Sequence, residues 1–340
     1  MALARALFPL VLTCAAACTS PAAPPAPTSD PIDAAGAASG TRIVGIEPDH
    51  REWEAVAPRV APALRTVPVL LFHSVCTDVC EVDDTYGITR ADLASLLGWL
   101  GANGYTSIRS ADYVRAVHGD RDGLPARPIL LTFDDGRSDA YAGADSLLRD
   151  AQAVATMFVI TGRPDSLAPG FMTWPEIVDA QASGRWDIQL HAADGHTQVA
   201  IGGASSALVT GPFFANRLYD SHTYELADGY LEPRAQWEAR VRDDLSRGID
   251  ALRTHLGVFE PSTFAVPYGD YGQSQSNDPT IAAELRALFD ATFPVWFTQS
   301  LAVDPAPNGS HEHFRYCVLR TTTPASIEAW LVASESAGAR

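Results

Sequence analysis

The sequence is poor in basic residues. Its 24 lysine and arginine residues are outnumbered by 41 aspartate and glutamate residues, which gives a formal net charge of -17. Such a chain has few cations with which to neutralise phosphates, so the composition argues against a nucleic acid or an anionic lipid surface as a partner. A neutral or cationic partner fits better, although an acidic surface also serves solubility alone.

The chain also lacks an apolar run long enough to span a bilayer, and it has no internal repeat. Arg5, a short apolar run over 6–12 and then small residues have the layout of an export signal. Residues 15–18, Ala-Ala-Ala-Cys, resemble the cleavage box of bacterial lipoproteins, which implies a lipid on Cys18. We expect residues 1–18 to direct export to the cell surface, with secretion without a lipid as the alternative and no membrane contact except an anchor at Cys18.

Large apolar side chains are nearly absent from residues 19–40, which consist almost entirely of Ala, Pro, Ser, Thr, Gly and Asp. Such a segment buries too little apolar surface to offset the entropy of ordering, and we expect a disordered tether. With 46% apolar residues the chain can bury a full core, and its length alone allows one large domain or two small ones. We expect residues 41–340 to form one large domain, on the strength of the motifs described below.

Cysteines are few. If Cys14 is removed with the signal and Cys18 is lipidated, three remain, an odd number for an oxidising compartment, so at least one stays unpaired. We expect Cys76 and Cys80 to bridge within one loop, with Cys317 left over, although the sequence does not fix the connectivity. The absence of a nearby second Cys or His pair argues against a zinc knuckle.

From Thr66 onward, short runs of branched apolar residues alternate with helix-like stretches, a pattern typical of an α/β fold with a largely parallel sheet. Helices are expected over 90–102, capped by Thr89 and stopped at Gly104, and over 174–182, capped by Thr173. The eight expected strands are Val67–Phe72, Thr106–Ile108, Pro128–Phe133, Ala155–Ile160, Asp187–Leu190, Thr263–Val266, Thr292–Phe297 and Tyr316–Leu319.

The stretch 197–233 interrupts this alternation. It is long, rich in glycine at its start and aromatic later, and long loops in compact domains are usually functional or disordered. We interpret it as one wall of a substrate groove, with a poorly ordered insertion as the alternative. Its aromatic residues are Phe213, Phe214, Tyr219, Tyr224 and Tyr230.

Two acidic residues end the most apolar strand. Residues 128–133 read as a strand buried on both faces, and Asp134, Asp135 and Gly136 follow at once. Adjacent carboxylates repel, so a cation or a shared proton is needed to keep them at a strand end, where β/α folds build their sites. Asp-Asp-Gly is also common turn chemistry, and alone it decides nothing.

Other strand ends carry histidines. The strand ending at Leu190 runs into His191 and, five residues later, His196, and two such histidines can turn onto one metal ion. With one aspartate they make a three-ligand set that leaves positions open for water and substrate. The strand ending at Phe72 is followed by His73, and another leads into Pro267, Tyr268 and Gly269.

Together these strand ends resemble the polysaccharide deacetylases of the NodB-homology type, carbohydrate esterase family 4, over about Val67 to Leu331. The segment Thr-Phe-Asp-Asp-Gly at 132–136, followed by Asp139 and Tyr141, carries the resemblance most specifically. It implies a distorted (β/α) barrel of about seven to eight largely parallel strands. It also implies that Asp134 is the catalytic base and that Asp135, His191 and His196 hold a divalent metal, which we expect to be zinc.

Two departures from the common pattern point to one branch of that family. Four residues separate His191 from His196 where three are usual, and Ala265 stands where an arginine usually orients the base. The spacing, the insertion after the histidines and the Pro-Tyr-Gly turn are similar to the branch that deacetylates poly-β-1,6-N-acetylglucosamine. That branch implies His73 as catalytic acid, and no Leu-x-x-His motif follows Tyr316 to supply another.

The resemblance also assigns Tyr268 to catalysis through its backbone amide, and Pro267, Tyr268 and Asp194 to substrate binding. The expected partner is an N-acetylated polysaccharide, while the oligomeric state stays open. Alternatives are a chitin or peptidoglycan deacetylase, and a non-catalytic glycan-binding lipoprotein, which the missing arginine favours. An aspartyl-phosphate phosphatase would need an acid two residues after Asp134, where Gly136 stands.

Overall fold

The computed structural model describes residues 66–77, 80, 84–204, 207–220, 230–257, 261–299 and 310–337. The expected signal and tether, with Cys18, lie outside these residues, as does Tyr224. None of the helices in the described ranges has the length and apolarity needed to cross a bilayer.

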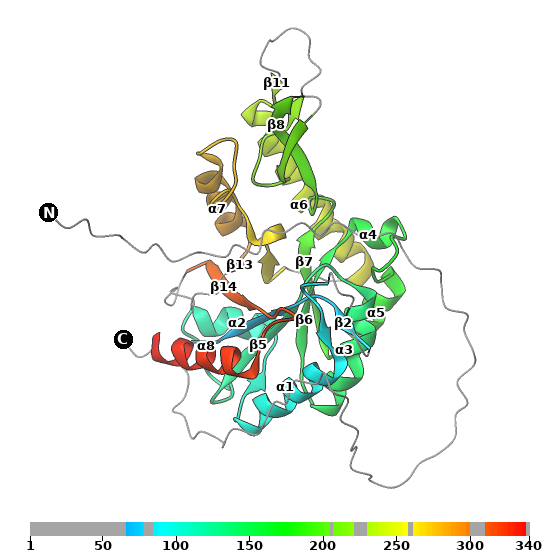
Figure 1. The fold of residues 1–340 in the computed structure, drawn as a ribbon, viewed down its shortest axis with the longest axis vertical. Helices are drawn as coiled ribbons and strands as arrows, with labels where there is room; N and C mark the ends of the chain where they lie inside the picture. The colour runs from blue at the N-terminus through cyan, green and yellow to red at the C-terminus, as the bar shows by residue number, and fades with distance from the viewer. Residues whose placement is uncertain are drawn as a thin grey trace, which may run out of the picture.

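Eight parallel strands form the central sheet, and seven of them close into a barrel (Figure 1). The sheet closes because β1 (Val69–Phe72) pairs with β5 (Pro128–Phe133) as well as with β14 (Glu312–Cys317). The eighth strand, β4 (Thr106–Ser107), pairs only with β5. The order continues from β5 through β6 (Ala155–Ile160), β7 (Trp186–Ala192), β12 (Thr263–Ala265) and β13 (Val295–Gln299) to β14.

Alternate residues of each strand face two separate apolar layers, because side chains of a strand point to opposite faces in turn. In β5, Ile129 and Leu131 face the helices, whereas Leu130 faces the barrel interior with Phe158 and Phe297. The helices around the barrel are α1 (Arg90–Ala102), α2 (Ser110–Val117), α3 (Ser138–Asp150), α4 (Gly162–Asp165), α5 (Trp174–Ala182), α6 (Arg234–Leu256), α7 (Ile281–Thr292) and α8 (Pro324–Ala337).

Both expected helices begin and end where the sequence places them. The hydroxyl of Thr89 accepts the Asp92 amide at the start of α1. At α5 the carboxylate of Glu176 accepts the Thr173 amide at 2.7 Å, which satisfies a donor that a helix start leaves open. The eight expected strands all overlap strands of the central sheet, although the last two are shifted: β13 begins at Val295 rather than Thr292, and β14 spans Glu312–Cys317 rather than 316–319.

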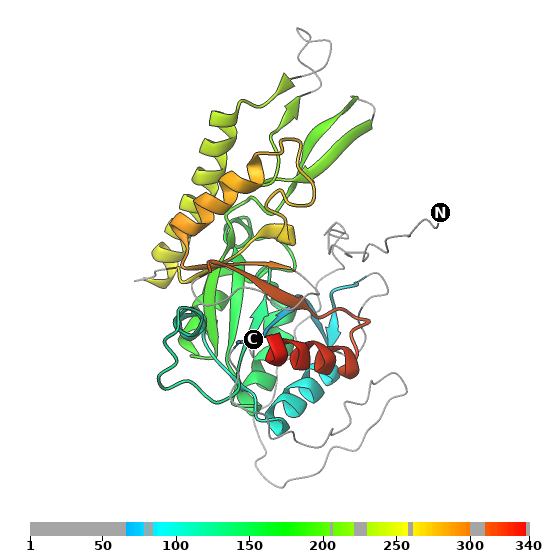
Figure 2. The same cartoon turned by 90° about the vertical axis from the view of Figure 1, so that its left-hand side faces the viewer.

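The stretch 197–233 is not one long loop. It contains the antiparallel pair β8 (Gln198–Ala204) and β9 (Ala207–Pro212) and the shorter pair β10 (Tyr219–Asp220) and β11 (Tyr230–Leu231). With α6 and α7 these strands form a projection beside the barrel, here called the arm (Figures 1 and 2). The guanidinium of Arg240 on α6 fastens the arm, since it bonds Glu232 and the carbonyl oxygens of Phe213 and Asn216.

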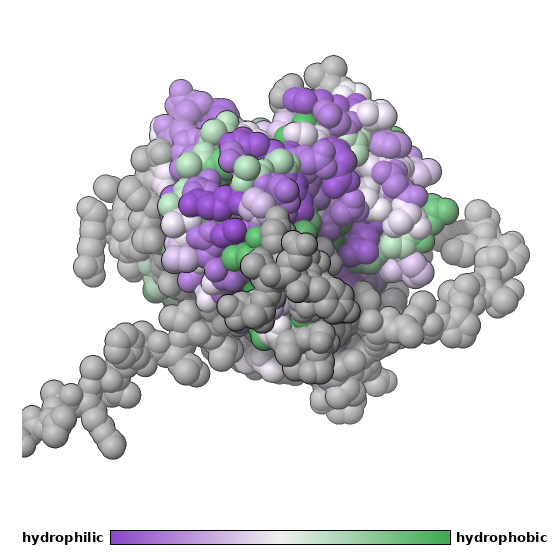
Figure 3. Space-filling model, turned by 90° about the horizontal axis from the view of Figure 1, so that it is seen from above, coloured by the Kyte–Doolittle hydropathy of each residue, from purple (hydrophilic) through white to green (hydrophobic). Residues whose placement is uncertain are grey.

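Few large apolar side chains reach the surface of the described residues. Those that do are Leu167, Val178, Leu208 and Val209. The face seen from the side of the arm is correspondingly hydrophilic over most of its described area (Figure 3). The fold therefore hides its apolar groups and presents polar ones beside the strand ends.

Candidate active site

The predicted residues gather at the carboxyl ends of the barrel strands. His73 follows β1, and Asp134 and Asp135 follow β5. His191 is the last residue but one of β7. Parallel strands bring these ends to one edge of the barrel. Residues more than 100 positions apart in the chain therefore meet at a single site, and the figures place this edge next to the arm (Figure 1).

Asp134 is completely buried and faces a cation that the sequence did not reveal. Its two carboxylate oxygens each accept a hydrogen bond of 2.7 Å from the guanidinium of Arg315, on β14. Burial opposes ionisation of Asp134, but Arg315 and then His191 outweigh it and hold the pKa of this carboxyl below its ordinary value. Asp134 is thus kept as a carboxylate in the barrel interior.

Asp135 points away from Arg315 because the chain turns sharply after Asp134. Its φ of 73° lies in the left-handed region, which is uncommon for a residue other than glycine. The turn carries Oδ1 of Asp135 to 3.5 Å from Nε2 of His191 and 3.4 Å from Nε2 of His196. Although burial opposes ionisation, the neighbouring histidines hold the pKa of Asp135 well below its ordinary range.

His191 is oriented by the strand beside it. Its Nδ1 lies 2.7 Å from the carbonyl oxygen of Ala265, so Nδ1 carries the proton and Nε2 is left as the ligand atom. The pairing of β6 with β7 shifts here, with Val159 opposite Leu190 and Ile160 opposite Ala192, which makes His191 the extra residue of a bulge. Burial opposes protonation of His191, but Asp134 and Asp135 raise its pKa.

His196, in the loop after β7, is the third member of the group formed with Asp135 and His191. Its side chain is buried, and burial lowers its pKa to about 4. Its ring lies 4.4 Å from the ring of Tyr268, measured between centroids. Tyr268 has a φ of 60°, a strained conformation for a tyrosine, in the short turn η1 (Pro267–Gly269) that follows β12.

The donor atoms of Asp135, His191 and His196 fit a divalent metal ion. They lie within 4.8 Å of one another and all three residues are buried. Two ligands held about 2.0–2.1 Å from one ion at the tetrahedral angle are about 3.4 Å apart, close to the separations found here. Oδ1 of Asp135 is also buried and accepts no hydrogen bond from the described residues, which a bound cation would remedy.

His73 lies on the same edge beside the two aspartates. Its ring is buried and packs against the ring of Tyr86 at 4.9 Å, and its Nδ1 has no hydrogen-bond partner among the described residues. Burial lowers the pKa of His73, although Asp135 and Asp134 oppose this. The disulfide between Cys76 and Cys80 closes the loop that begins three residues later, while Cys317 is a buried thiol in β14.

Comparison with known proteins identifies the type of domain that carries this site. Residues 121–284 match the model of the polysaccharide deacetylase family. The chain carries a polysaccharide deacetylase domain. Over 198 residues it is 27% identical to the poly-β-1,6-N-acetyl-D-glucosamine N-deacetylase of Escherichia coli K12, a match that covers 54% of this chain and 28% of that protein. The chain therefore spans about a quarter of the length of this relative.

Solved structures share the fold of this deacetylase domain. IcaB from Ammonifex degensii superposes with a TM-score of 0.56 at 25% identity, covering 79% of this chain and 97% of that one. A de-N-acetylase from Aggregatibacter actinomycetemcomitans gives a TM-score of 0.62 at 22% identity, covering 78% and 99% of the two chains. These matches agree with the expected barrel of parallel strands.

In this deacetylase domain, Arg315 takes the place of the arginine that is absent at position 265. Ala265 lacks the side chain that would orient the base, and the structure places an arginine of β14 on Asp134 instead. The expected strand begins at Tyr316 and so leaves Arg315 out of the barrel. No clear signal was present, because polar residues fall on both alternating faces of this segment, with Glu312 on one face and His313 and Arg315 on the other.

Two of the five aromatic residues of the insertion, Phe213 and Phe214, do not form an open wall. Phe214 is 1% exposed and belongs to the core, and Phe213 lies under the guanidinium of Arg240, 4.0 Å from its ring centroid. Both stabilise the arm against α6, which corrects the interpretation of these two residues. The carboxylate of Asp194 is turned to Arg247 at 2.7 Å, and its predicted role in substrate binding stays a prediction.

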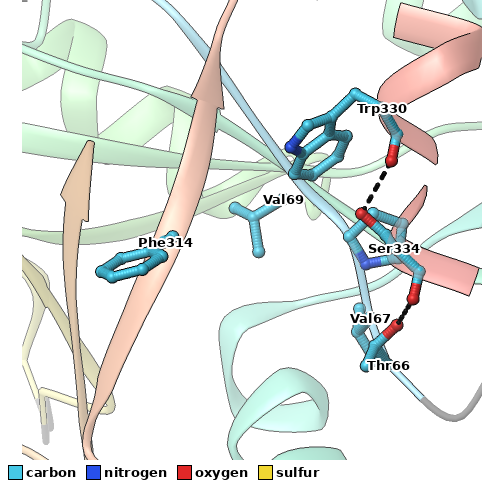
Figure 4. Close-up of a pocket in the computed structure, with 7 residues that line it drawn as sticks. Thr66, Val67, Val69, Phe314, Trp330 and Ser334 are labelled. Atoms are coloured by element: carbon cyan, nitrogen blue, oxygen red, sulfur yellow. Dashed lines mark hydrogen bonds between the residues drawn. The ribbon is translucent and has the colours of Figure 1, made fainter. Parts of the chain in front are cut away.

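A small cavity elsewhere in the domain has no chemistry of its own. It lies between β1, β14 and α8 and is lined by Thr66, Val67, Val69, Phe314, Trp330 and Ser334 (Figure 4). None of these side chains titrates. Thr66 donates to the carbonyl oxygen of Ser334 and so joins α8 to the residues before β1, while the Ser334 hydroxyl donates to the carbonyl oxygen of Trp330 within α8.

Proposed function

We propose that the chain is an exported, zinc-dependent enzyme that removes acetyl groups from N-acetylhexosamine units of a polysaccharide, with poly-β-1,6-N-acetylglucosamine as the first candidate. The observation that carries the proposal is the carboxylate of Asp134, held ionised by Arg315 beside the three-ligand set. The name of the Escherichia coli relative supports the choice of polymer.

The chemistry needs an activated water and a stabilised oxyanion. A zinc ion held by Asp135, His191 and His196 would supply a Lewis acid for the acetamide carbonyl and lower the pKa of water. Asp134 takes a proton from the water as its oxygen attacks the carbonyl carbon. The backbone amide of Tyr268, in the turn after β12, donates to the oxyanion that develops.

The carbon–nitrogen bond then breaks, and the leaving amine takes a proton from His73. The products are acetate and a free amino sugar, which is cationic near neutral pH. An acidic protein suits such a product, because unlike charges attract and a hydrophilic face offers hydrogen bonds to sugar hydroxyls (Figure 3).

A non-catalytic glycan-binding role drew its support from the missing arginine at position 265. Arg315 removes that argument, since it forms the two hydrogen bonds to Asp134 that an orienting arginine would form. The alternatives that stay within the same chemistry, chitin oligomers and peptidoglycan, differ in the polymer alone.

The decisive experiment is acetate release by the purified protein from poly-β-1,6-N-acetylglucosamine, chitin oligomers and peptidoglycan, each with and without a chelator. We expect the first polymer to be the best substrate and the chelator to stop release from it. Bound glycan and bound zinc without any acetate release would show the non-catalytic role instead.

Two substitutions separate the base from the ligand. Asp134→Asn should keep zinc but lose turnover, because the amide cannot take the proton from water. Asp135→Asn should lose zinc as well as turnover. Asp150→Asn, at an exposed position on α3, serves as the matched control and should behave as the parent protein. An active Asp134→Asn variant, or stoichiometric zinc in Asp135→Asn, contradicts the assignment.

Export rests on residues 1–18 and is tested separately. We expect the protein in the membrane fraction of its host, labelled by a radioactive fatty acid, and we expect Cys18→Ser to remove the label. A labelled Cys18→Ser variant would contradict the anchor, and an unlabelled parent protein in the medium would indicate plain secretion.

A further inference from the structure

The loop between the two metal-ligand histidines is one residue longer than is usual, and an aspartate of α6 holds it. Asp244 is completely buried. Its Oδ2 accepts the amide of Ala193 at 3.0 Å, and its Oδ1 accepts the amide of Asp194 at 2.8 Å. One carboxylate thus binds two consecutive amides between His191 and His196.

The other side of the same loop is held by the end of β6. The amides of Thr161 and Gly162 donate to the carbonyl oxygens of Ala192 and Ala193, at 2.9 Å and 3.0 Å. Ala193 is therefore bonded at its amide by α6 and at its carbonyl by the β6 end. The loop has little freedom to move toward either element.

Close packing restricts the residues that this loop can carry. A Cβ added to Gly195 would lie 2.7 Å from the ring of Phe214 and 3.0 Å from Oδ2 of Asp244. A Cβ added to Gly162 would lie 2.1 Å from a carboxylate oxygen of Asp194. Both glycines are needed because backbone or side-chain atoms approach them more closely than any Cβ allows.

The side-chain groups that hold the loop come from the stretch after the histidines. Phe214 precedes α6 in the arm, and Asp244 lies in the middle of α6. Arg247, one turn further along α6, bonds the Asp194 carboxylate at 2.7 Å and lies 3.5 Å from Asp244. The insertion and the longer histidine loop are therefore parts of one packed unit.

We infer that Asp244 is a positioning residue for the metal site: by holding the amides of Ala193 and Asp194, it sets the path that brings His196 to His191 and Asp135. The inference rests on the metal site of the proposed function. The carboxylate is suited to this task because its two oxygens only accept hydrogen bonds, whereas an asparagine would turn a donor toward one of the two amides.

The test is the zinc affinity of the full-length Asp244→Asn variant, measured by competition with a chromophoric chelator. We expect a dissociation constant about 10–100-fold weaker than that of the parent protein, the usual effect of losing a partner that orients metal ligands. Asp250→Asn, exposed on the same helix, is the matched control and should bind zinc as the parent does. Excess zinc should restore part of the turnover of Asp244→Asn.

A merely structural role gives a different result. In that case Asp244→Asn would lower the melting temperature of the metal-free protein but bind zinc within about twofold of the parent, which would overturn the inference. If the parent protein binds no zinc, the proposed metal site fails rather than the role of Asp244.

A second measurement needs no variant and holds if Asp244→Asn does not fold. In the metal-free parent protein, the amides of Ala193 and Asp194 should exchange with solvent as slowly as those of the neighbouring strand β7. Exchange at the rate of an open loop before zinc is added would overturn the inference.

Discussion

Arg315 and Asp134 form a charge pair inside the barrel, where neither side chain is exposed to water. The guanidinium also packs against the rings of Phe158 and Phe297, 5.3 Å and 5.7 Å from their centroids. A carboxylate buried there without its cation would take a proton, because desolvation disfavours the charged form. The arginine therefore keeps Asp134 able to accept a proton.

Arg315→Gln should consequently raise the pKa of Asp134 and lower kcat/KM at neutral pH by about 100-fold or more, the usual contribution of a general base. The acidic limb of the pH profile should move to higher pH, while zinc stays bound because the three ligands are unchanged. Arg127→Gln is the matched control, since Arg127 is buried at Tyr105 and the Asn103 carbonyl. A pH profile in Arg315→Gln identical to that of the parent would contradict this role.

His73, the proposed general acid, should determine the basic limb of the pH profile of kcat/KM. A general acid must be protonated, and burial lowers the pKa of His73 from its ordinary value of 6.5. The protonated fraction therefore falls as the pH rises through a value below 6.5, and kcat/KM should fall with it. Steady-state kinetics from pH 4.5 to 9 would measure this limb. Its persistence in His73→Asn would show that another group is the acid.

At the scale of elements, the strands were predictable because their patterns are local. Residues 128–133 and 155–160 are largely apolar runs that end at a polar residue, Asp134 and Thr161, and both match their strands to the residue. The caps at Thr89 and Thr173 are equally local. All eight predicted strands overlap strands of the central sheet, and in the barrel strands such as β5 and β6 this is because apolar side chains are buried on both faces.

Two features depend on contacts between distant segments and were missed: the first four residues of β14 and the strand pairs of the insertion. β14 carries Glu312, His313 and Arg315 within a buried strand, so its composition conceals it until Asp134 is brought opposite. The insertion forms paired strands because α6 supplies Arg240 and the barrel supplies core contacts for Phe214. A single sequence does not show which distant partner will satisfy such a group.

The disulfide between Cys76 and Cys80 stabilises the strands and turn that lie next to His73. It closes the turn after β2 (Val75–Cys76), which pairs with β3 (Ile88–Thr89) close to Tyr86. Replacing both cysteines by serine frees a loop of about five residues in the unfolded chain, which should cost about 2 kcal/mol of unfolding free energy. It should also lower kcat, because Tyr86 packs on His73.

Urea unfolding, kcat and zinc content measure these effects, and zinc should stay stoichiometric because no ligand lies on β2 or β3. Thr173→Ala is the control for stability alone, since losing this cap of α5 costs about 1 kcal/mol and α5 carries neither His73 nor Tyr86. An unchanged kcat in the double serine variant would limit the disulfide to stability.

At the scale of the whole molecule, the site exists only when the barrel is closed. Its residues come from β1, β5, β7, β12 and β14, and the first and last of these strands meet only at closure. The metal ligands therefore have no common geometry in the unfolded chain, and metal binding is coupled to folding. Zinc should stabilise the entire domain rather than one loop.

This coupling sets a pH dependence for metal-linked stability. Zinc needs an unprotonated Nε2 on His191, whose pKa the two aspartates raise above 6.5. Stabilisation by zinc should be complete above that raised pKa and decline as the pH falls through it.

With free zinc at about 1,000 times its dissociation constant, the gain is about 4 kcal/mol, or a rise in Tm of about 10 °C. Calorimetry with zinc and with chelator at pH 8.5 and pH 5.5 measures the difference, and Asp135→Asn should show no zinc effect at either pH. A zinc-dependent rise in Tm of equal size at both pH values, or one that persists in Asp135→Asn, would place the metal elsewhere.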